Sequence, residues 1–296
     1  MPNAKLLNYL HLHFIVFIWG FTAVLGALIS IDALGLVWFR MSIASLLILA
    51  WVGYKKIPLT FSKKTMLFFL LAGAIIAMHW LAFFGAIKTA NVSITLAIMS
   101  TGSFFTALLE PIFFKRKVIW YEVVFGLVVV LGLYVIFQVE GDYSWGIILA
   151  LISSFLGALF SVINGKLAVR YNASAISFYE LFFGVCCISL YLFFSGSFDA
   201  SFFILSISDW GYLFILASGC TAYAFIASVH VMKWISPYTV MLTINLEPVY
   251  GIVLALLILG ESENMGPQFY YGAAIIILTV LANGIIKNRI KKKLKN

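Results

Sequence analysis

Ionisable side chains inside long apolar runs are the residues of this sequence that could carry chemistry. If such a run crosses a bilayer, a charge near its centre costs about 3 kcal/mol and needs a partner or a water-filled cavity. Five charges meet this description: Arg40, Glu110, Glu122, Glu180 and Glu247.

Glu247 lies near the middle of the run 237–259 and directly precedes Pro248. The proline ring removes a backbone donor and leaves the carbonyl of Ile244 without its usual helical partner. A bent helix that offers a spare carbonyl and an acid predicts a site for a cation, an ammonium group or a proton. The alternative is a structural acid that is hydrogen-bonded to a neighbouring helix.

The other four charges allow simpler interpretations. Arg40 could receive a carboxylate or extend its side chain outward to the membrane surface. Glu180 is interpreted as an interfacial anchor. Glu110 and Glu122 lie close to the basic cluster 115–117, and we expect them to reach the interface or to pair there.

Uncharged groups extend the candidate site. His79 and Trp80 lie in the middle of another apolar run, where the histidine could relay protons or act as a hydrogen-bonded core residue. Further candidate lining residues, chosen because they are polar or aromatic within apolar runs, are Trp19, Ser100, Ser103, Asn164, Tyr223 and Asn245.

The composition requires a membrane around these residues. Hydrophobic residues make up 64% of the 296 and charged residues 10%, with a mean hydropathy of +1.09, and a soluble domain has too little interior for so much apolar surface. The basic residues stand in short clusters between apolar runs, so the net charge of +8 does not indicate nucleic-acid binding. The three cysteines lie within apolar runs at spacings that fit neither a disulfide framework nor a metal site.

Ten segments are long enough to cross a bilayer, which takes about 20 residues in a helix. The fold predicted is therefore an all-α integral membrane protein with ten transmembrane helices, and the first run is interpreted as an uncleaved span. The segments are 10–29, 34–53, 66–87, 91–114, 119–138, 145–165, 173–195, 210–232, 237–259 and 268–286.

The basic residues assign sides to these spans, because lysine and arginine flanking a span are retained in the cytoplasm. With ten spans, 17 of the 19 basic residues fall on the side of both termini, and Arg40 and Lys88 are the exceptions. We therefore expect both termini to be cytoplasmic.

A weak internal repeat at an offset of about 146 predicts two five-helix halves, 1–138 and 144–296, the second with a basic cytoplasmic tail. Five spans are an odd number, so the second half enters the membrane inverted, as in many secondary transporters. The face at helical spacing formed by Thr243, Glu247 and Tyr250 corresponds to one that includes Thr101 and Phe104. The two faces could form opposite walls of one cavity.

The order of several short motifs resembles the EamA-type branch of the drug/metabolite transporter superfamily. The motifs are Trp19-Gly20, Phe39-Arg40, Ala86-Ile87-Lys88, Leu246-Glu247-Pro248 and Gly260-Glu261. The resemblance covers nearly the whole chain and implies a central cavity, alternating access, and export or exchange of small metabolites such as amino acids. The first half departs from the pattern, because Phe114-Lys115 stands where the family has Gly-Glu.

The leading hypothesis is a secondary active transporter that exports or exchanges a small amphipathic metabolite, with protons or another ion as a possible coupling partner. No GxxxxGK[ST] loop is present to bind ATP, and the sequence predicts no cofactor and no catalytic role. The alternatives are a lipid-modifying membrane enzyme, for which the histidines are poorly spaced, and a channel. A carrier with so little soluble mass is typical of a bacterial inner membrane.

Overall fold

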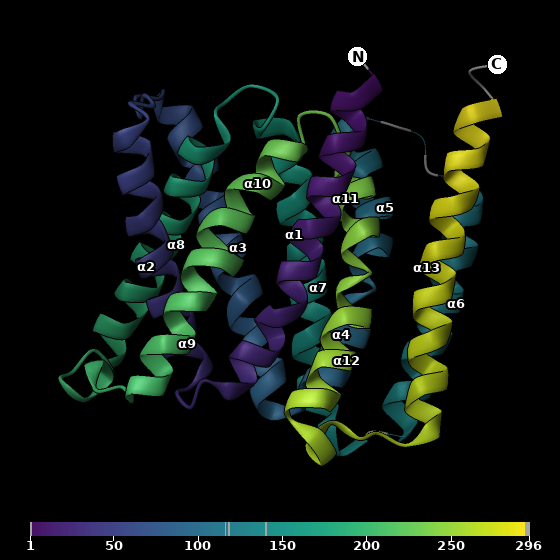
Figure 1. Ribbon diagram of the computed structural model, residues 1–296. Coiled ribbons are helices and arrows are strands. Elements are labelled where there is room, and N and C mark those ends of the chain that lie inside the picture. Colours follow the sequence, from purple (N-terminus) through teal and green to yellow (C-terminus); the bar gives the residue numbers. More distant parts are fainter. Residues whose placement is uncertain (1, 116, 118, 140, 294–296) are drawn as a thin grey trace.

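The computed structural model describes residues 2–115, 117, 119–139 and 141–293, and helices without any strand make up this described part (Figure 1). The α-helices are α1 (Pro2–Leu28), α2 (Ala33–Tyr54), α3 (Lys63–Thr89), α4 (Val92–Met99), α5 (Gly102–Phe114), α6 (Trp120–Val139), α7 (Ser144–Leu167), α8 (Ala173–Ser195), α9 (Ile207–Ala217), α10 (Ala224–Val231), α11 (Pro237–Ile244), α12 (Glu247–Ile258) and α13 (Pro267–Lys293). A π-helix, η3 (Ser218–Tyr223), joins α9 to α10, and three short 3₁₀ turns are η1 (Gly141–Tyr143), η2 (Ser201–Phe203) and η4 (Gly260–Glu263).

The helices form ten passes, as the sequence predicts. Within the described residues, nine segments are long and apolar enough to cross a membrane, and α6 adds a shorter apolar stretch, Val124–Ile136. The chain is therefore a multi-pass, all-helical membrane protein.

Three of the ten passes are interrupted, although the sequence analysis drew each as one continuous run. The fourth pass breaks at Ser100 and Thr101, between α4 and α5, and the ninth at Asn245 and Leu246, between α11 and α12. The eighth pass is α9, the π-helix η3 and α10 in succession. Pro248 accounts for the break in the ninth pass only, because the fourth has no proline at its break.

The two halves are inverted copies. Successive passes alternate in direction, so the sixth pass starts at the end opposite to the first, and both termini lie at one end of the bundle (Figure 1). The contacts repeat with the halves exchanged, since α1 packs on α12 as α7 packs on α4 and α5. The breaks in the fourth and ninth passes fall at corresponding positions of the two halves.

The fifth and tenth passes, α6 and α13, pack on each other at the edge of the bundle (Figure 1). Gly132 and Gly272 face each other across this contact. A Cβ added to either would lie 3.0 Å from the carbonyl oxygen of the other, so only glycine permits the helices to approach this closely. The remaining passes surround the centre of the molecule.

Short polar side chains begin many of the helices. Asp32, Ser62, Asn91, Asn172 and Ser236 each accept a hydrogen bond from a backbone N–H in the first turn of the helix that follows. These caps satisfy amide groups that the helix itself leaves unpaired. The polar residues between apolar runs therefore determine where the passes begin.

Two buried glutamates bind the first turns of the broken passes, and we call these contacts the glutamate clasps. The Glu263 carboxylate accepts hydrogen bonds from the amides of Val92 (3.0 Å) and Ser93 (2.8 Å) at the start of α4. The Glu110 carboxylate accepts one from the amide of Tyr238 (3.2 Å) at the start of α11. Glu110 lies near the end of the fourth pass and binds the start of the ninth. Glu263 follows the end of the ninth pass and binds the start of the fourth. The two passes are therefore joined at both ends.

The clasps correct one interpretation drawn from the sequence. Glu110 is 3% exposed and bonds to the second half, so it does not reach the interface beside the cluster 115–117. The side chain of Glu122 lies outside the described residues.

Replacing Glu263 tests the clasp. Glu263→Ala leaves two amides at the start of α4 without their acceptor, which should lower the free energy of unfolding by about 1–3 kcal/mol. Glu261→Ala is the matched control, because Glu261 is exposed two residues away. Thermal unfolding in detergent should separate the two variants, and equal stabilities would contradict a structural role for the clasp.

Candidate substrate-binding cavity

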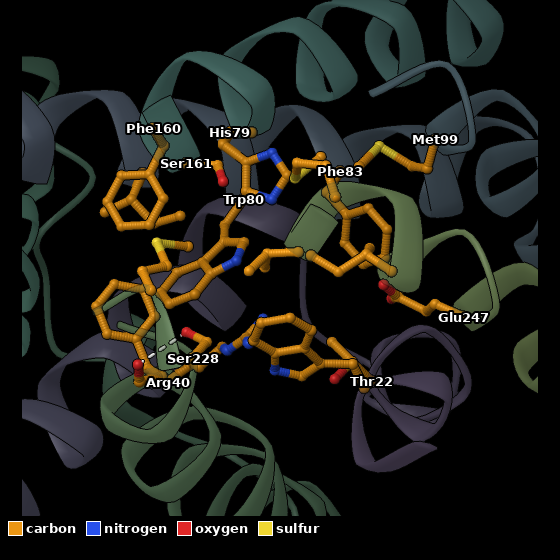
Figure 2. A pocket seen from close by; sticks show the side chains of 18 residues that line it. Thr22, Arg40, His79, Trp80, Phe83, Met99, Phe160, Ser161, Ser228 and Glu247 are labelled. Carbon is orange, nitrogen blue, oxygen red and sulfur yellow. Dashed lines mark hydrogen bonds between the residues drawn. The ribbon is translucent and has the colours of Figure 1, made fainter. Parts of the chain in front are cut away.

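A cavity of about 110 Å³ lies at the centre of the bundle and is lined by both halves (Figure 2). Its walls are mainly aromatic and aliphatic, and a few polar side chains interrupt them. Its lining residues are Trp19, Thr22, Arg40, Ile76, His79, Trp80, Phe83, Met99, Gly157, Phe160, Ser161, Phe225, Ser228, Met232, Val240, Met241, Ile244 and Glu247. Apolar walls with few convergent polar groups are typical of small-molecule sites.

Arg40 on α2 supplies the positive charge of the cavity. Its side chain is 1% exposed, its Nε donates a hydrogen bond to Thr221 Oγ1 (2.6 Å), and its guanidinium carbon lies 4.0 Å from the centre of the Trp80 ring and 5.3 Å from that of Phe84. Its Nη1 is buried and has no hydrogen-bond partner. The guanidinium is therefore held along one edge, while an N–H donor remains for a ligand.

The π-helix η3 provides the acceptor that holds Arg40. Its wider turn lets Thr221 Oγ1 donate to the carbonyl of Leu216 (2.7 Å), five residues earlier, while the same oxygen accepts from Arg40. The neighbouring carbonyl of Cys220 accepts a hydrogen bond from Trp19 Nε1 (3.1 Å). The irregular turn thus fixes two residues of the cavity wall.

Glu247 supplies the negative charge and comes from the other half of the chain. It is the first residue of α12, directly after the break in the ninth pass. Figure 2 shows the side chains of Glu247 and Arg40 directed into the same space, and no hydrogen bond joins these two described residues. The cavity therefore presents two opposite charges that do not neutralise each other by direct contact.

His79 on α3 is anchored to α7. Its Nδ1 lies 2.8 Å from the carbonyl oxygen of Ser153, and the hydroxyl of Ser153 donates to the carbonyl of His79 (3.0 Å). Because the Ser153 carbonyl can only accept a hydrogen bond, Nδ1 of His79 carries the hydrogen, and Nε2 is the nitrogen left for the cavity. Figure 2 shows the ring at the cavity wall.

The structure brings together five of the fourteen candidate residues, namely Trp19, Arg40, His79, Trp80 and Glu247. It does not place the other nine among the lining residues. The predicted face of Thr243, Glu247 and Tyr250 is divided because the helix breaks between Thr243 and Glu247, which changes the direction in which the later side chains point.

Five of these nine lie at or beside the helix breaks, where they make hydrogen bonds. The Thr101 hydroxyl lies 2.8 Å from that of Ser154, and Ser100 donates to the carbonyl of Leu96. Asn245 Nδ2 donates to Ser103 Oγ (3.0 Å), and this bond joins the two breaks to each other. Thr243 donates to the carbonyl of Thr239 (2.9 Å).

Of the remaining four, Asn164 bonds to Glu180 on α8, and the other three are aromatic residues that pack elsewhere. Phe104 borders a separate small pocket together with Gly126. Tyr250 contacts the Phe17 ring, with centroids 5.5 Å apart. Tyr223 is 44% exposed, and its hydroxyl lies 2.9 Å from His11 Nε2.

Several polar residues of the cavity wall were not among the candidates named from the sequence, namely Thr22, Ser161 and Ser228. Isolated small polar residues occur throughout the apolar runs, so their position on the cavity wall becomes visible only when the packing is known. Within the described residues, no group of three or more His, Cys, Asp or Glu side chains could hold a metal ion.

Two inverted five-helix halves, broken helices that meet at their centre and a cavity between them define a membrane transporter architecture. The model of the EamA-like transporter family matches residues 8–138 and again residues 144–284, so the chain belongs to this family, within the drug/metabolite transporter superfamily. No curated protein matches the chain. One solved structure with a similar fold, described as "Crystal structure of protein", superposes with a TM-score of 0.69 at 15% sequence identity. The match covers 94% of this chain and 97% of the chain in that structure.

Removing the acceptor of Arg40 tests how the cavity is held. Thr221→Val leaves Nε without its partner, which should cost about 1–3 kcal/mol of stability. Thr95→Val is the control, because the hydroxyl of Thr95 is equally buried and bonds only to the carbonyl of Asn91 in its own helix turn. A thermal unfolding experiment in detergent should show the larger loss for Thr221→Val; the reverse order would contradict this anchoring.

Proposed function

We propose that the protein is a secondary transporter for a small amphipathic metabolite that carries both a carboxylate and an ammonium group, such as an amino acid. The observation that carries this proposal is the pair of opposite charges in one cavity, Arg40 and Glu247, which do not bond to each other. A zwitterion would supply the missing partner of each.

The chemistry of the walls supports this substrate class. A guanidinium binds a carboxylate through charge-assisted hydrogen bonds, and the unpaired Nη1 of Arg40 is available for one. Glu247 would accept hydrogen bonds from the ammonium group. Trp80, Phe83 and Phe160 would contact the apolar part of the substrate.

The inverted halves support a transport cycle by alternating access. One charge of the site comes from each half, so a relative movement of the halves would open the cavity first to one side and then to the other. Energy would come from the gradient of an ion or of the substrate, and the direction we propose is export or exchange. Of the fourteen candidate residues named from the sequence, five form the proposed site: Trp19, Arg40, His79, Trp80 and Glu247.

The charge distribution supports a cytoplasmic position for both termini. The connections that hold Lys55, Lys56, Lys115, Arg170 and Lys233 follow passes that end on the side of the N-terminus (Figure 1). By the rule that basic loops remain in the cytoplasm, this is the cytoplasmic end. We propose a bacterial inner membrane as the location.

Counterflow in proteoliposomes tests the transport function and the site together. The wild-type protein should exchange external labelled amino acid for internal unlabelled amino acid, which neither an enzyme nor a channel does. Glu247→Gln and Arg40→Gln each remove a charge-assisted hydrogen bond, so each should lower exchange about tenfold or more. Glu261→Gln, at an exposed position, is the control.

Substrate analogues assign the two roles. Glu247→Gln should lose the preference for the amino acid over its deaminated analogue, and Arg40→Gln the preference over its decarboxylated analogue. Wild-type exchange in folded Glu247→Gln protein would remove the acid from the site.

Cysteine labelling tests the orientation in intact cells. In a background without Cys186, Cys187 and Cys220, an impermeant maleimide should label Asp199→Cys directly and Arg170→Cys only after the membrane is opened, since both positions are exposed at opposite ends. Labelling of Arg170→Cys from outside would reverse the topology.

A further inference from the structure

Another acid, apart from those of the clasps, is buried outside the central cavity. Glu180 on α8 is 0% exposed, and its Oε1 accepts a hydrogen bond from Asn164 Nδ2 of α7 (3.0 Å). Its Oε2 is buried and has no partner. The interpretation of Glu180 as an interfacial anchor is therefore wrong, because this carboxyl group lies wholly inside the protein.

No cation of the described chain neutralises this carboxyl group. The basic side chains on the helices around it are Arg40 on α2, Lys63, Lys64, His79 and Lys88 on α3, Lys166 on α7 and His230 on α10. None of them forms a hydrogen bond with Glu180; Arg40 bonds to Thr221, and His79 to Ser153. An ionised carboxylate in such a place would pay the desolvation cost of a charge without compensation.

Further unpaired polar atoms connect Glu180 with the cavity. Ser161 and Asn164 lie one turn apart on α7, and Ser177 and Glu180 lie one turn apart on α8. The oxygen atoms Ser161 Oγ, Asn164 Oδ1 and Ser177 Oγ are all buried without a partner. Ser161 also lines the central cavity, so a row of polar groups runs from the cavity wall to the buried acid.

We propose that Glu180 is a proton-binding site that exchanges its proton with water in the central cavity beside Ser161, and that this exchange couples transport to a proton gradient. The proposed coupling rests on the proposed transport function, whereas the proton site rests on the geometry alone. With the proton on Oε2, the group is a neutral acid whose carbonyl oxygen, Oε1, accepts the hydrogen bond from Asn164.

The step conserves charge and atoms. When the halves move and water reaches the row of polar groups, the O–H bond at Oε2 breaks, the proton passes to water, and the carboxylate remains hydrated. A proton from water on the other side of the membrane forms the bond again after the halves return. No electron is transferred.

Infrared spectroscopy of the purified protein tests the proton site without a substrate. At neutral pH, the wild-type spectrum should contain the carbonyl band of a protonated carboxyl group, which Glu180→Gln should lose and Glu261→Gln should keep. A spectrum without this band, or a band that remains in Glu180→Gln, would overturn the proposal. If Glu180→Gln does not fold, Asn164→Leu removes only the donor to Oε1 and should shift the band; an unshifted band would assign the proton to another acid.

Transport driven by a pH gradient tests the coupling. The substrate is the labelled amino acid that the wild-type protein exchanges in counterflow. For one proton per substrate, a gradient of one pH unit should let the wild-type protein accumulate it about tenfold. Glu180→Gln should retain counterflow within about twofold and accumulate nothing. Accumulation by Glu180→Gln at the wild-type level would show a structural acid and overturn the coupling.

The two proposals fail separately. A wild-type protein without counterflow for any amino acid would refute the proposed substrate class, while the infrared bands would still decide whether Glu180 holds a proton.

Discussion

A backbone amide at membrane depth must be satisfied by the protein itself, and the rest of this structure depends on how that requirement is met at the broken passes. Every helix leaves the N–H groups of its first turn without a partner in the helix. The clasps of Glu263 and Glu110 bind such groups at the starts of α4 and α11, where the two broken passes begin. At the breaks within these passes, the amides of Thr101 and Leu246 each donate a hydrogen bond to the carbonyl three residues earlier. The protein itself thus satisfies these amides at the centre of the bundle.

The irregular turns in return create the polar features of the cavity. The break in the ninth pass places Glu247 in the first turn of α12, and the π-helix in the eighth pass directs Thr221 towards Arg40. One charge belongs to each half, so the cavity exists only where the two inverted copies meet. The same reasoning explains why aromatic residues dominate its walls, since they fill space around two charges without adding further polar groups.

The sequence predicts the ten passes and their inverted arrangement well, because each pass needs about 20 apolar residues and the basic clusters fall on one side. It does not predict the break at Ser100 and Thr101, where no proline marks it, or the π-helix. The interpretations of Glu110 and Glu180 were both wrong. Glu110 was expected to pair with the basic cluster close to it in the sequence, but it bonds to Tyr238, 128 residues away. Glu180 was expected at the membrane interface, but it is buried and bonds to Asn164 on the neighbouring helix. Cavity residues such as Ser161 depend on such long-range packing, which local composition does not encode.

The exchange of clasps between the halves has a consequence for biogenesis. The amides of Val92 and Ser93 enter the membrane with the first half, and Glu263 is synthesised about 170 residues later. Translation therefore delivers a first half in which these two amides lack their acceptor until Glu263 has been made. A gene for one half alone would encode a protein that can complete this contact only with a second copy inserted in the opposite orientation. Fusion of two such halves into one chain ensures that the oppositely oriented partner is always made, in equal amount and in the same place.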